Sequence, residues 1–101
     1  MYVRVLNFVC RADAEQSEIQ RVYRLLADQA GSVDGFIGSS LLMREGACNG
    51  MALIYWKDSE SASRAGPELL KLLAEHAHHL LDHAPDVEGF YVIENGIIPT
   101  D

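Results

Sequence analysis

The chain has 101 residues, which is the size of a single domain. Hydrophobic residues make up 49% of it and charged residues 23%, a balance that excludes intrinsic disorder. The formal net charge of −7 at pH 7 disfavours binding to nucleic acids and to anionic membranes. A chain of this size can bury only a marginal core of its own, so a partner subunit would add to its stability.

We expect neither a targeting signal nor a membrane span. Arg4 and Asn7 interrupt the apolar N-terminal run, which also lacks the basic segment and cleavage site of a secretory signal. No apolar stretch approaches the length of a membrane helix. The two cysteines, Cys10 and Cys48, are too few for a disulfide framework. We therefore expect two free thiols in a cytoplasmic protein.

Residues 2–10 predict a strand with two largely apolar faces. One face consists of Val3, Val5, Asn7 and Val9, and the other of Tyr2, Arg4, Leu6, Phe8 and Cys10. Because a strand that is apolar on both faces is typical of a sheet covered on both sides, we expect both sides of this strand to be covered.

Residues 14–30 predict an amphipathic helix. Its apolar stripe is formed by Ile19, Val22, Tyr23, Leu26, Ala27 and Ala30. Asp13 and Gln16 resemble a capping box at the start of the helix, and Gly31 supplies its end. Two strands, 36–44 and 51–57, are then predicted to form a hairpin, because only a short cluster of turn residues separates them.

The second helical region is predicted in two pieces. Asp58 or Ser59 caps a short helix over 59–65, Gly66-Pro67 interrupts it, and a second stretch runs to about residue 83. The buried stripe of the second stretch is expected to comprise Leu70, Leu73, Ala77, Leu80, Leu81 and Ala84.

Residues 89–95 predict the last strand, and a short apolar tail follows at Ile97–Pro99. The resulting order is β-α-β-β-α-β in a single domain over residues 1–101. This order predicts an α+β, ferredoxin-like fold with a four-stranded antiparallel sheet and two helices on one face. The other sheet face would then be covered by a second copy of the chain, in a homodimer built sheet against sheet.

Several segments resemble the antibiotic-biosynthesis monooxygenase family of small dimeric α+β barrels. The first strand reaches Asn7, the segment 33–38 (Val-Asp-Gly-Phe-Ile-Gly) is similar to the family's PGF-G turn, and Tyr55-Trp56-Lys57-Asp58-Ser59-Glu60 is similar to its W-x-S-x-E junction. The resemblance covers nearly the whole chain. It implies a dimeric barrel with a pocket between helices and sheet, but the fold hosts several reactions and some members without a known one.

Two branches of the family remain open. The cofactor-independent quinone-forming branch has an Asn four residues before the strand Trp; Trp56 is present here, but Ala52 stands in the place of the Asn. The haem-degrading branch combines a strand-one Asn, a Trp and a helix His. Asn7 matches the first of these, Ala65 stands near the place of the Trp, and the histidines come about one turn late.

Four histidines, His76, His78, His79 and His83, form the densest cluster of chemically active side chains. On a continuous helix, His76, His79 and His83 share one flank beside the buried stripe, and His76 lies closest to it. We predict that His76 enters the pocket as a general base or as a haem axial ligand. The alternative is the polar flank of a surface helix. A zinc site at His79 and His83 lacks further ligands, so no metal site is expected.

Asn7 is predicted to be the second catalytic residue, because an amide on an apolar strand face needs a hydrogen-bond partner. It would donate to a substrate oxygen or to dioxygen, or else make a structural bond. Trp56, Tyr23 and His79 are predicted to line the substrate site. Core packing is the alternative for Trp56 and Tyr23.

These residues favour a small monooxygenase that uses no cofactor and oxidises an electron-rich phenol or quinol with dioxygen. One alternative is a haem-binding or haem-degrading enzyme that uses Asn7 and His76. Another is a non-catalytic dimer that binds small molecules. The expected partners are a second copy of the chain and a small aromatic molecule, with neither nucleic acid nor membrane.

Overall fold

The structure, a computed structural model, describes residues 1–96. In chain order, its elements are β1 (Tyr2–Val9), α1 (Gln16–Gly31), β2 (Phe36–Met43), β3 (Asn49–Trp56), α2 (Ser59–His76) and β4 (Asp86–Tyr91). This order confirms the predicted ferredoxin-like α+β fold. The predicted tail at Ile97–Pro99 lies outside the described residues.

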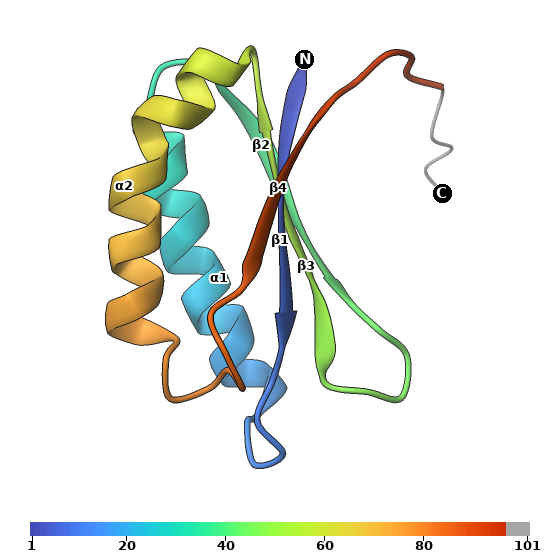
Figure 1. Cartoon of the computed structure of the whole chain (residues 1–101), viewed down its shortest axis with the longest axis vertical. Coiled ribbons are helices and arrows are strands. Elements are labelled where there is room, and N and C mark those ends of the chain that lie inside the picture. Colours follow the sequence, from blue (N-terminus) through green and yellow to red (C-terminus); the bar gives the residue numbers. More distant parts are fainter. Residues whose placement is uncertain (97–101) are drawn as a thin grey trace.

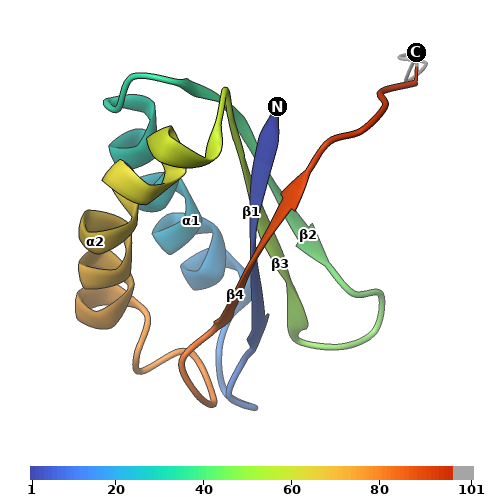
Figure 2. The ribbon, with the colours of Figure 1, turned by 45° about the horizontal axis from the view of Figure 1, so that its top comes forward.

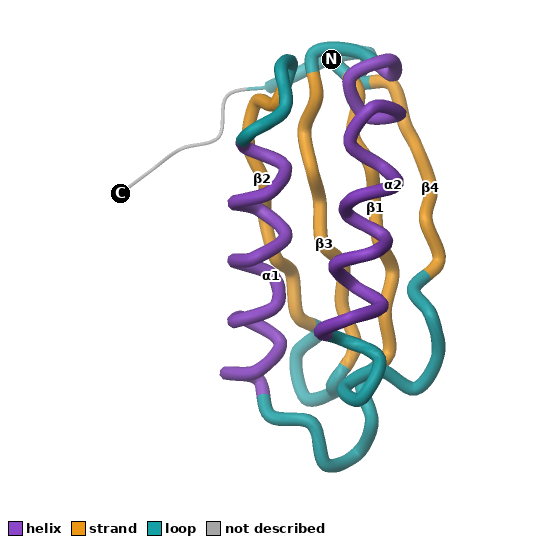
Figure 3. Tube along the Cα trace, turned by 90° about the vertical axis from the view of Figure 1, so that its left-hand side faces the viewer, coloured by secondary structure: helices purple, strands orange, loops and turns teal. Residues whose placement is uncertain are grey.

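The four strands form one antiparallel sheet in the order β2-β3-β1-β4. Both helices cover the same face of this sheet, as the edge-on view shows (Figure 1). Seen from the helix side, α1 and α2 stand side by side in front of the strands (Figure 3). After β4, the chain leaves the sheet and runs away from the helices (Figure 2). The molecule therefore has two layers, with the core between them.

The core consists of the strand residues that point towards the helices and the helix residues that point back. Leu6 of β1 is paired with Ala52 of β3 and Val87 of β4, which fixes which side chains face the helices. One buried cluster contains Tyr2, Leu6, Leu26, Ala30, Ala52, Ile54, Trp56, Ala62, Ala65 and Leu69. The other contains Phe8, Cys10, Ile19, Val22, Ala77, Leu80 and Leu81.

Helix α1 follows the sequence prediction closely. Ile19, Val22, Leu26 and Ala30 are buried, as the amphipathic stripe predicts. The helix begins at Gln16 rather than at residue 14, and Glu15, its N-cap, makes no side-chain hydrogen bond. The predicted capping box at Asp13 and Gln16 is therefore absent.

Helix α2 differs from the prediction in three ways. It is continuous through Gly66-Pro67, because Ala62, Ala65 and Leu69 face the core on both sides of that dipeptide. Its buried stripe includes Leu69 in place of Leu70, which is 53% exposed, whereas Ala77, Leu80 and Leu81 of the predicted stripe are buried. It ends at His76 instead of residue 83.

The early end of α2 results from pairing between the next segment and the end of β1. The Arg11 N–H donates to the Leu80 carbonyl (2.8 Å), and the Asp82 N–H donates to the Val9 carbonyl (2.9 Å). These bonds take the backbone out of the helix. Strand β4 consequently spans Asp86–Tyr91 and not 89–95.

The expectation of two free thiols is wrong, because Cys10 and Cys48 form a disulfide. Cys10 follows β1 and Cys48 precedes β3, and the antiparallel pair Val9 and Asn49 places the two cysteines beside each other. The Cys10 N–H also donates to the Cys48 carbonyl (2.8 Å). An argument for the cytoplasm from free thiols therefore does not hold.

None of the helices within residues 1–96 is long and apolar enough to cross a membrane.

Candidate functional site

Two of the cavities among the described residues lie between the helices and the sheet. The smaller one, of about 40 Å³, lies between both helices and the sheet, and its lining is apolar apart from Tyr23. Leu6, Phe8, Leu26 and Leu73 are among the side chains that enclose it. This is the gap in which we expected the substrate pocket.

The hydroxyl of Tyr23 is the polar group at this smaller cavity. It lies 2.6 Å from the hydroxyl of Ser39 on β2, and either oxygen can be the donor. The pair ties the middle of α1 to the sheet and brings a hydroxyl to an otherwise apolar wall. Tyr23 therefore lines the cavity, and its role in substrate binding stays a prediction.

The larger cavity, of about 180 Å³, lies between α2 and strands β1, β3 and β4. Arg4 and Trp56 line it together with apolar side chains, of which Leu6 is shared with the smaller cavity. Trp56 is fully buried and packs edge-on against Phe36, with ring centroids 5.8 Å apart. Its indole N–H has no acceptor among the described residues.

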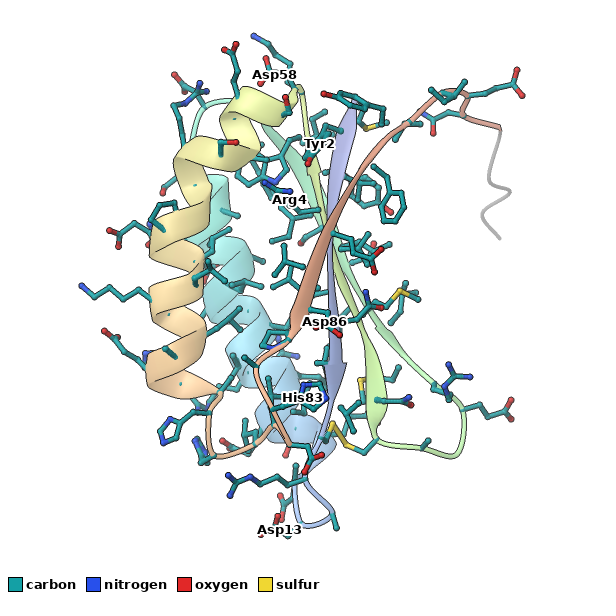
Figure 4. All side chains as sticks on the ribbon, in the orientation of Figure 1. Tyr2, Arg4, Asp13, Asp58, His83 and Asp86 are labelled. Atoms are coloured by element: carbon teal, nitrogen blue, oxygen red, sulfur yellow. A yellow bond between two sulfur atoms is a disulfide. The ribbon has the colours of Figure 1, made fainter. Side chains whose placement is uncertain are left out.

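Asn7 lies on the opposite face of the sheet from these cavities. The strand alternation that turns Leu6 and Phe8 towards the helices turns Asn7 away from them. Its amide donates to a Glu88 carboxylate oxygen on β4 (3.0 Å). It also borders an open depression of about 470 Å³ with His83 and Asp86, two residues that Figure 4 shows at the lower end of the sheet. Asn7 therefore does not reach the helix–sheet gap in which we expected it to act.

His76 lines neither cavity on the helix side. Its side chain is 42% exposed, and its Nε2 atom lies 3.9 Å from a Glu75 carboxylate oxygen. His79 is exposed and packs edge-on against His78. The predicted shared flank of His76, His79 and His83 is wrong, because only His76 is on the helix.

The predicted haem site does not fit this arrangement. Asn7 and His76 lie on opposite sides of the sheet, so one macrocycle cannot contact both within one chain. Within residues 1–96, no group of three or more His, Cys, Asp or Glu side chains is placed to hold a metal ion.

Sequence reasoning missed Arg4 as a site residue, although a signal for it was present. Arg4 is the one charged residue on the strand face that otherwise carries Tyr2, Leu6, Phe8 and Cys10. A cation on an apolar face that packs against helices needs a partner, in the same way as the amide of Asn7. Because side chains alternate along a strand, Arg4 faces the helices and Asn7 faces away from them.

No protein-family model matches the chain, and no curated protein matches it in sequence. Solved structures of antibiotic-biosynthesis-monooxygenase-like proteins are nevertheless similar to it. SnoaB, a cofactor-independent oxygenase from Streptomyces nogalater, is 21% identical with a TM-score of 0.73, over 93% of this chain and 94% of that one. A putative antibiotic biosynthesis monooxygenase from Nitrosomonas europaea is 11% identical with a TM-score of 0.72, over 93% and 100% of the two chains.

A third similar structure is a mutant of MhuD with two manganese protoporphyrin IX molecules bound per active site. It is 19% identical, with a TM-score of 0.72, over 95% of this chain and 98% of that one. Identities this low show a shared fold and leave the reaction open. The chain thus has the fold of the antibiotic-biosynthesis-monooxygenase-like proteins.

Proposed function

We propose that this protein is a small oxygenase that needs no cofactor and acts on an electron-rich aromatic such as a phenol or a quinol. The observation that carries this proposal is the pair of largely apolar cavities under the helices, of which Tyr23 lines the smaller and Trp56 the larger. The similarity in fold to SnoaB, a cofactor-independent oxygenase, supports it.

This chemistry requires few functional groups from the protein. A phenol or quinol that has lost a proton is electron-rich enough to reduce dioxygen itself: one oxygen atom forms a new C–O bond on the ring, the other leaves as water, and the substrate supplies all the electrons. The site must then exclude water and stabilise the negative charge on the substrate oxygen. The Tyr23 hydroxyl, held by its hydrogen bond with Ser39, is the neutral donor at the smaller cavity.

The two cavities are smaller than the roughly 300–1,000 Å³ of a typical ligand site. Leu6 lines both of them. We infer that the substrate is a small aromatic whose entry moves Leu6.

Oxygen uptake with simple quinols, without added cofactor or metal, tests the proposal. We expect uptake by the wild type, and a decrease of about 100-fold in Tyr23→Phe, which keeps the ring and removes only the hydroxyl. Tyr55→Phe makes the same change on the other sheet face, where β3 pairs Tyr55 with Val3, and should leave the rate unchanged. Wild-type protein that binds quinols without consuming oxygen would instead indicate a non-catalytic binding protein.

The catalytic roles of Asn7 and His76, and the substrate-binding role of His79, stay predictions. The variants Asn7→Ala, His76→Ala and His79→Ala test them one by one in the same oxygen assay. Loss of uptake in His76→Ala with an unchanged circular dichroism spectrum would keep His76 as the base. Unchanged uptake would remove it from the site and leave deprotonation to the solvent.

The haem alternative has its own test. Because Asn7 and His76 are on opposite sides of the sheet, we expect haemin to produce no saturable Soret shift that depends on His76. A shift in the wild type that disappears in His76→Ala would contradict the cofactor-free proposal.

We also propose that two copies of the chain pack through the sheet face that the helices leave bare. Apolar side chains on that face are strongly exposed in the single chain, among them Leu42 (44%) and Phe90 (49%). A second copy that covers the same face would bury them on both chains. We expect wild-type protein to sediment as a dimer and Leu42→Glu to sediment as a monomer. Leu70→Glu adds the same charge on the helix side and should leave the dimer intact.

A further inference from the structure

Arg4 is a cation without a matching anion in the described part of the chain. It projects from β1 towards the helices, beside Tyr2 (Figure 4). Its Nη1 atom donates to the Tyr2 hydroxyl (2.8 Å), and its guanidinium lies 5.3 Å from the centre of the Tyr2 ring. Within residues 1–96, no carboxylate lies within ion-pair distance of it. Four of its five N–H groups therefore have no protein acceptor among these residues.

Gly89 on β4 leaves the space in which the heads of Arg4 and Tyr2 sit. It is the cross-strand neighbour of Arg4. A Cβ atom at this position would lie 2.9 Å from Arg4 Nη1 and would overlap the Tyr2 hydroxyl. A side chain at residue 89 would therefore displace the guanidinium from its place beside the cavity under α2.

Trp56 lines the same cavity. Its side chain is fully buried, and its indole N–H has no acceptor among the described residues. Arg4 and Trp56 lie on β1 and β3, which are adjacent strands of the sheet.

The rest of the cavity is apolar. Leu6, Ile54, Leu69 and Val87 are among the side chains that line it. The volume of about 180 Å³ limits the occupant to a small molecule. The chain's own net charge of −7 repels polyanions, which favours a ligand with a single negative charge.

We propose that this cavity binds a small apolar carboxylate, with its carboxylate group held by the Arg4 guanidinium. A guanidinium presents its donors in a planar fork that matches the two oxygens of a carboxylate. The inference rests on the proposed function in so far as it names the class of substrate, an aromatic acid. The binding itself does not require that the protein be an oxygenase.

The test is a titration of ¹⁵N-labelled full-length protein with benzoate. The chain has one tryptophan, so one indole N–H signal reports directly on Trp56. We expect this signal to shift saturably with benzoate. Benzamide has nearly the same shape as benzoate but no charge. Its affinity should be lower than that of benzoate by about tenfold or more. An unmoved indole signal, or equal affinity for benzoate and benzamide, would overturn the proposal.

Two variants and a matched control place the carboxylate at Arg4. Arg4→Gln should weaken benzoate binding by about tenfold or more. Arg24→Gln makes the same change in net charge at an exposed position of α1 and should bind as the wild type does. If Arg4→Gln does not fold, Gly89→Ala keeps the arginine but displaces it, and should weaken benzoate binding too. Wild-type affinity in a folded Arg4 or Gly89 variant would refute the site.

These measurements need no turnover. A protein that binds benzoate but consumes no oxygen would refute the proposed function and leave this inference standing. A protein that oxidises quinols but does not bind benzoate would support the proposed function and refute this inference.

Discussion

Gly35 and Gly46 are two glycines with left-handed backbone conformations, at φ values of +96° and +74°. They differ in their surroundings. A Cβ atom on Gly35 would overlap the Ser61 side chain at the start of α2, whereas Gly46 has open space around it. Gly35 also supplies the carbonyl that accepts the Lys57 N–H (2.7 Å). The Gly-Phe turn thus packs directly against the strand-to-helix junction that follows β3.

The two glycines permit a matched prediction at the level of single residues. Gly46→Ala should lower the free energy of unfolding by about 1 kcal/mol, which is the cost of the backbone conformation alone. Gly35→Ala should lower it by roughly 2–4 kcal/mol, because Ser61 must also move. Urea unfolding of both variants measures this difference. Equal losses would mean that the turn does not contact Ser61 in solution.

Asp58 gives a prediction about pH. Its carboxylate accepts the Ser61 backbone N–H (2.8 Å) and the Ser61 hydroxyl (2.7 Å), as the predicted N-cap of α2. The backbone N–H first and the hydroxyl second hold the pKa of Asp58 below its usual range. Because this pKa is lower in the folded state, the carboxylate stabilises the protein above its unfolded-state pKa. That contribution is lost as the pH falls through the lowered value.

The expected outcome is a stability difference between wild type and Asp58→Ala that shrinks on acidification. It should be fully present at neutral pH and smallest below the lowered pKa of Asp58. Chemical unfolding at several pH values measures it. Asp28→Ala, at an exposed position of α1, is the control and should show no such trend. A difference that is independent of pH would show that the charge of Asp58 does not matter for the cap.

At the level of elements, α2 permits a test of its own continuity. Gly66 lies inside the helix, and a Cβ atom there would meet no neighbour within 4 Å. Gly66→Ala should therefore raise the free energy of unfolding by about 0.5–1 kcal/mol, since alanine is the better helix former. Thermal unfolding measures the gain. No gain, or a loss, would favour the interrupted helix that the Gly-Pro dipeptide predicts.

The two helices show what a sequence can and cannot predict. The stripe of α1 was predictable because its spacing is regular and nothing interrupts it. The end of α2 was not, because it depends on hydrogen bonds from Arg11 and to Val9, which lie just after β1 and at its end, far away in the chain. Because α2 ends at His76, the predicted flank of His76, His79 and His83 does not form. The side of the sheet on which Asn7 lies was predictable from the alternation of side chains along the strand. The prediction that Asn7 acts between the helices and the sheet did not take this alternation into account.

At the level of the whole molecule, the disulfide between Cys10 and Cys48 closes a loop that contains α1 and β2. Linking residues 38 positions apart removes conformations from the unfolded chain. Reduction should lower the free energy of unfolding by roughly 2–4 kcal/mol. Urea unfolding with and without a reducing agent measures this, and the double variant Cys10→Ser/Cys48→Ser should be insensitive to the reagent. Two reactive thiols in the untreated, unfolded protein would contradict the disulfide.

The position of β1 in the sheet also determines the order in which the fold can be completed. β1 lies between β3 and β4, which the ribosome makes much later. While the chain is being synthesised, both hydrogen-bonding edges of β1 stay unpaired until residues 49–56 and then 86–91 have emerged. Most of its pairings thus span large sequence separations, which slows folding. In the nascent chain, β1 is therefore an exposed apolar strand with two open edges, the feature most prone to aggregation and chaperone capture before folding is complete.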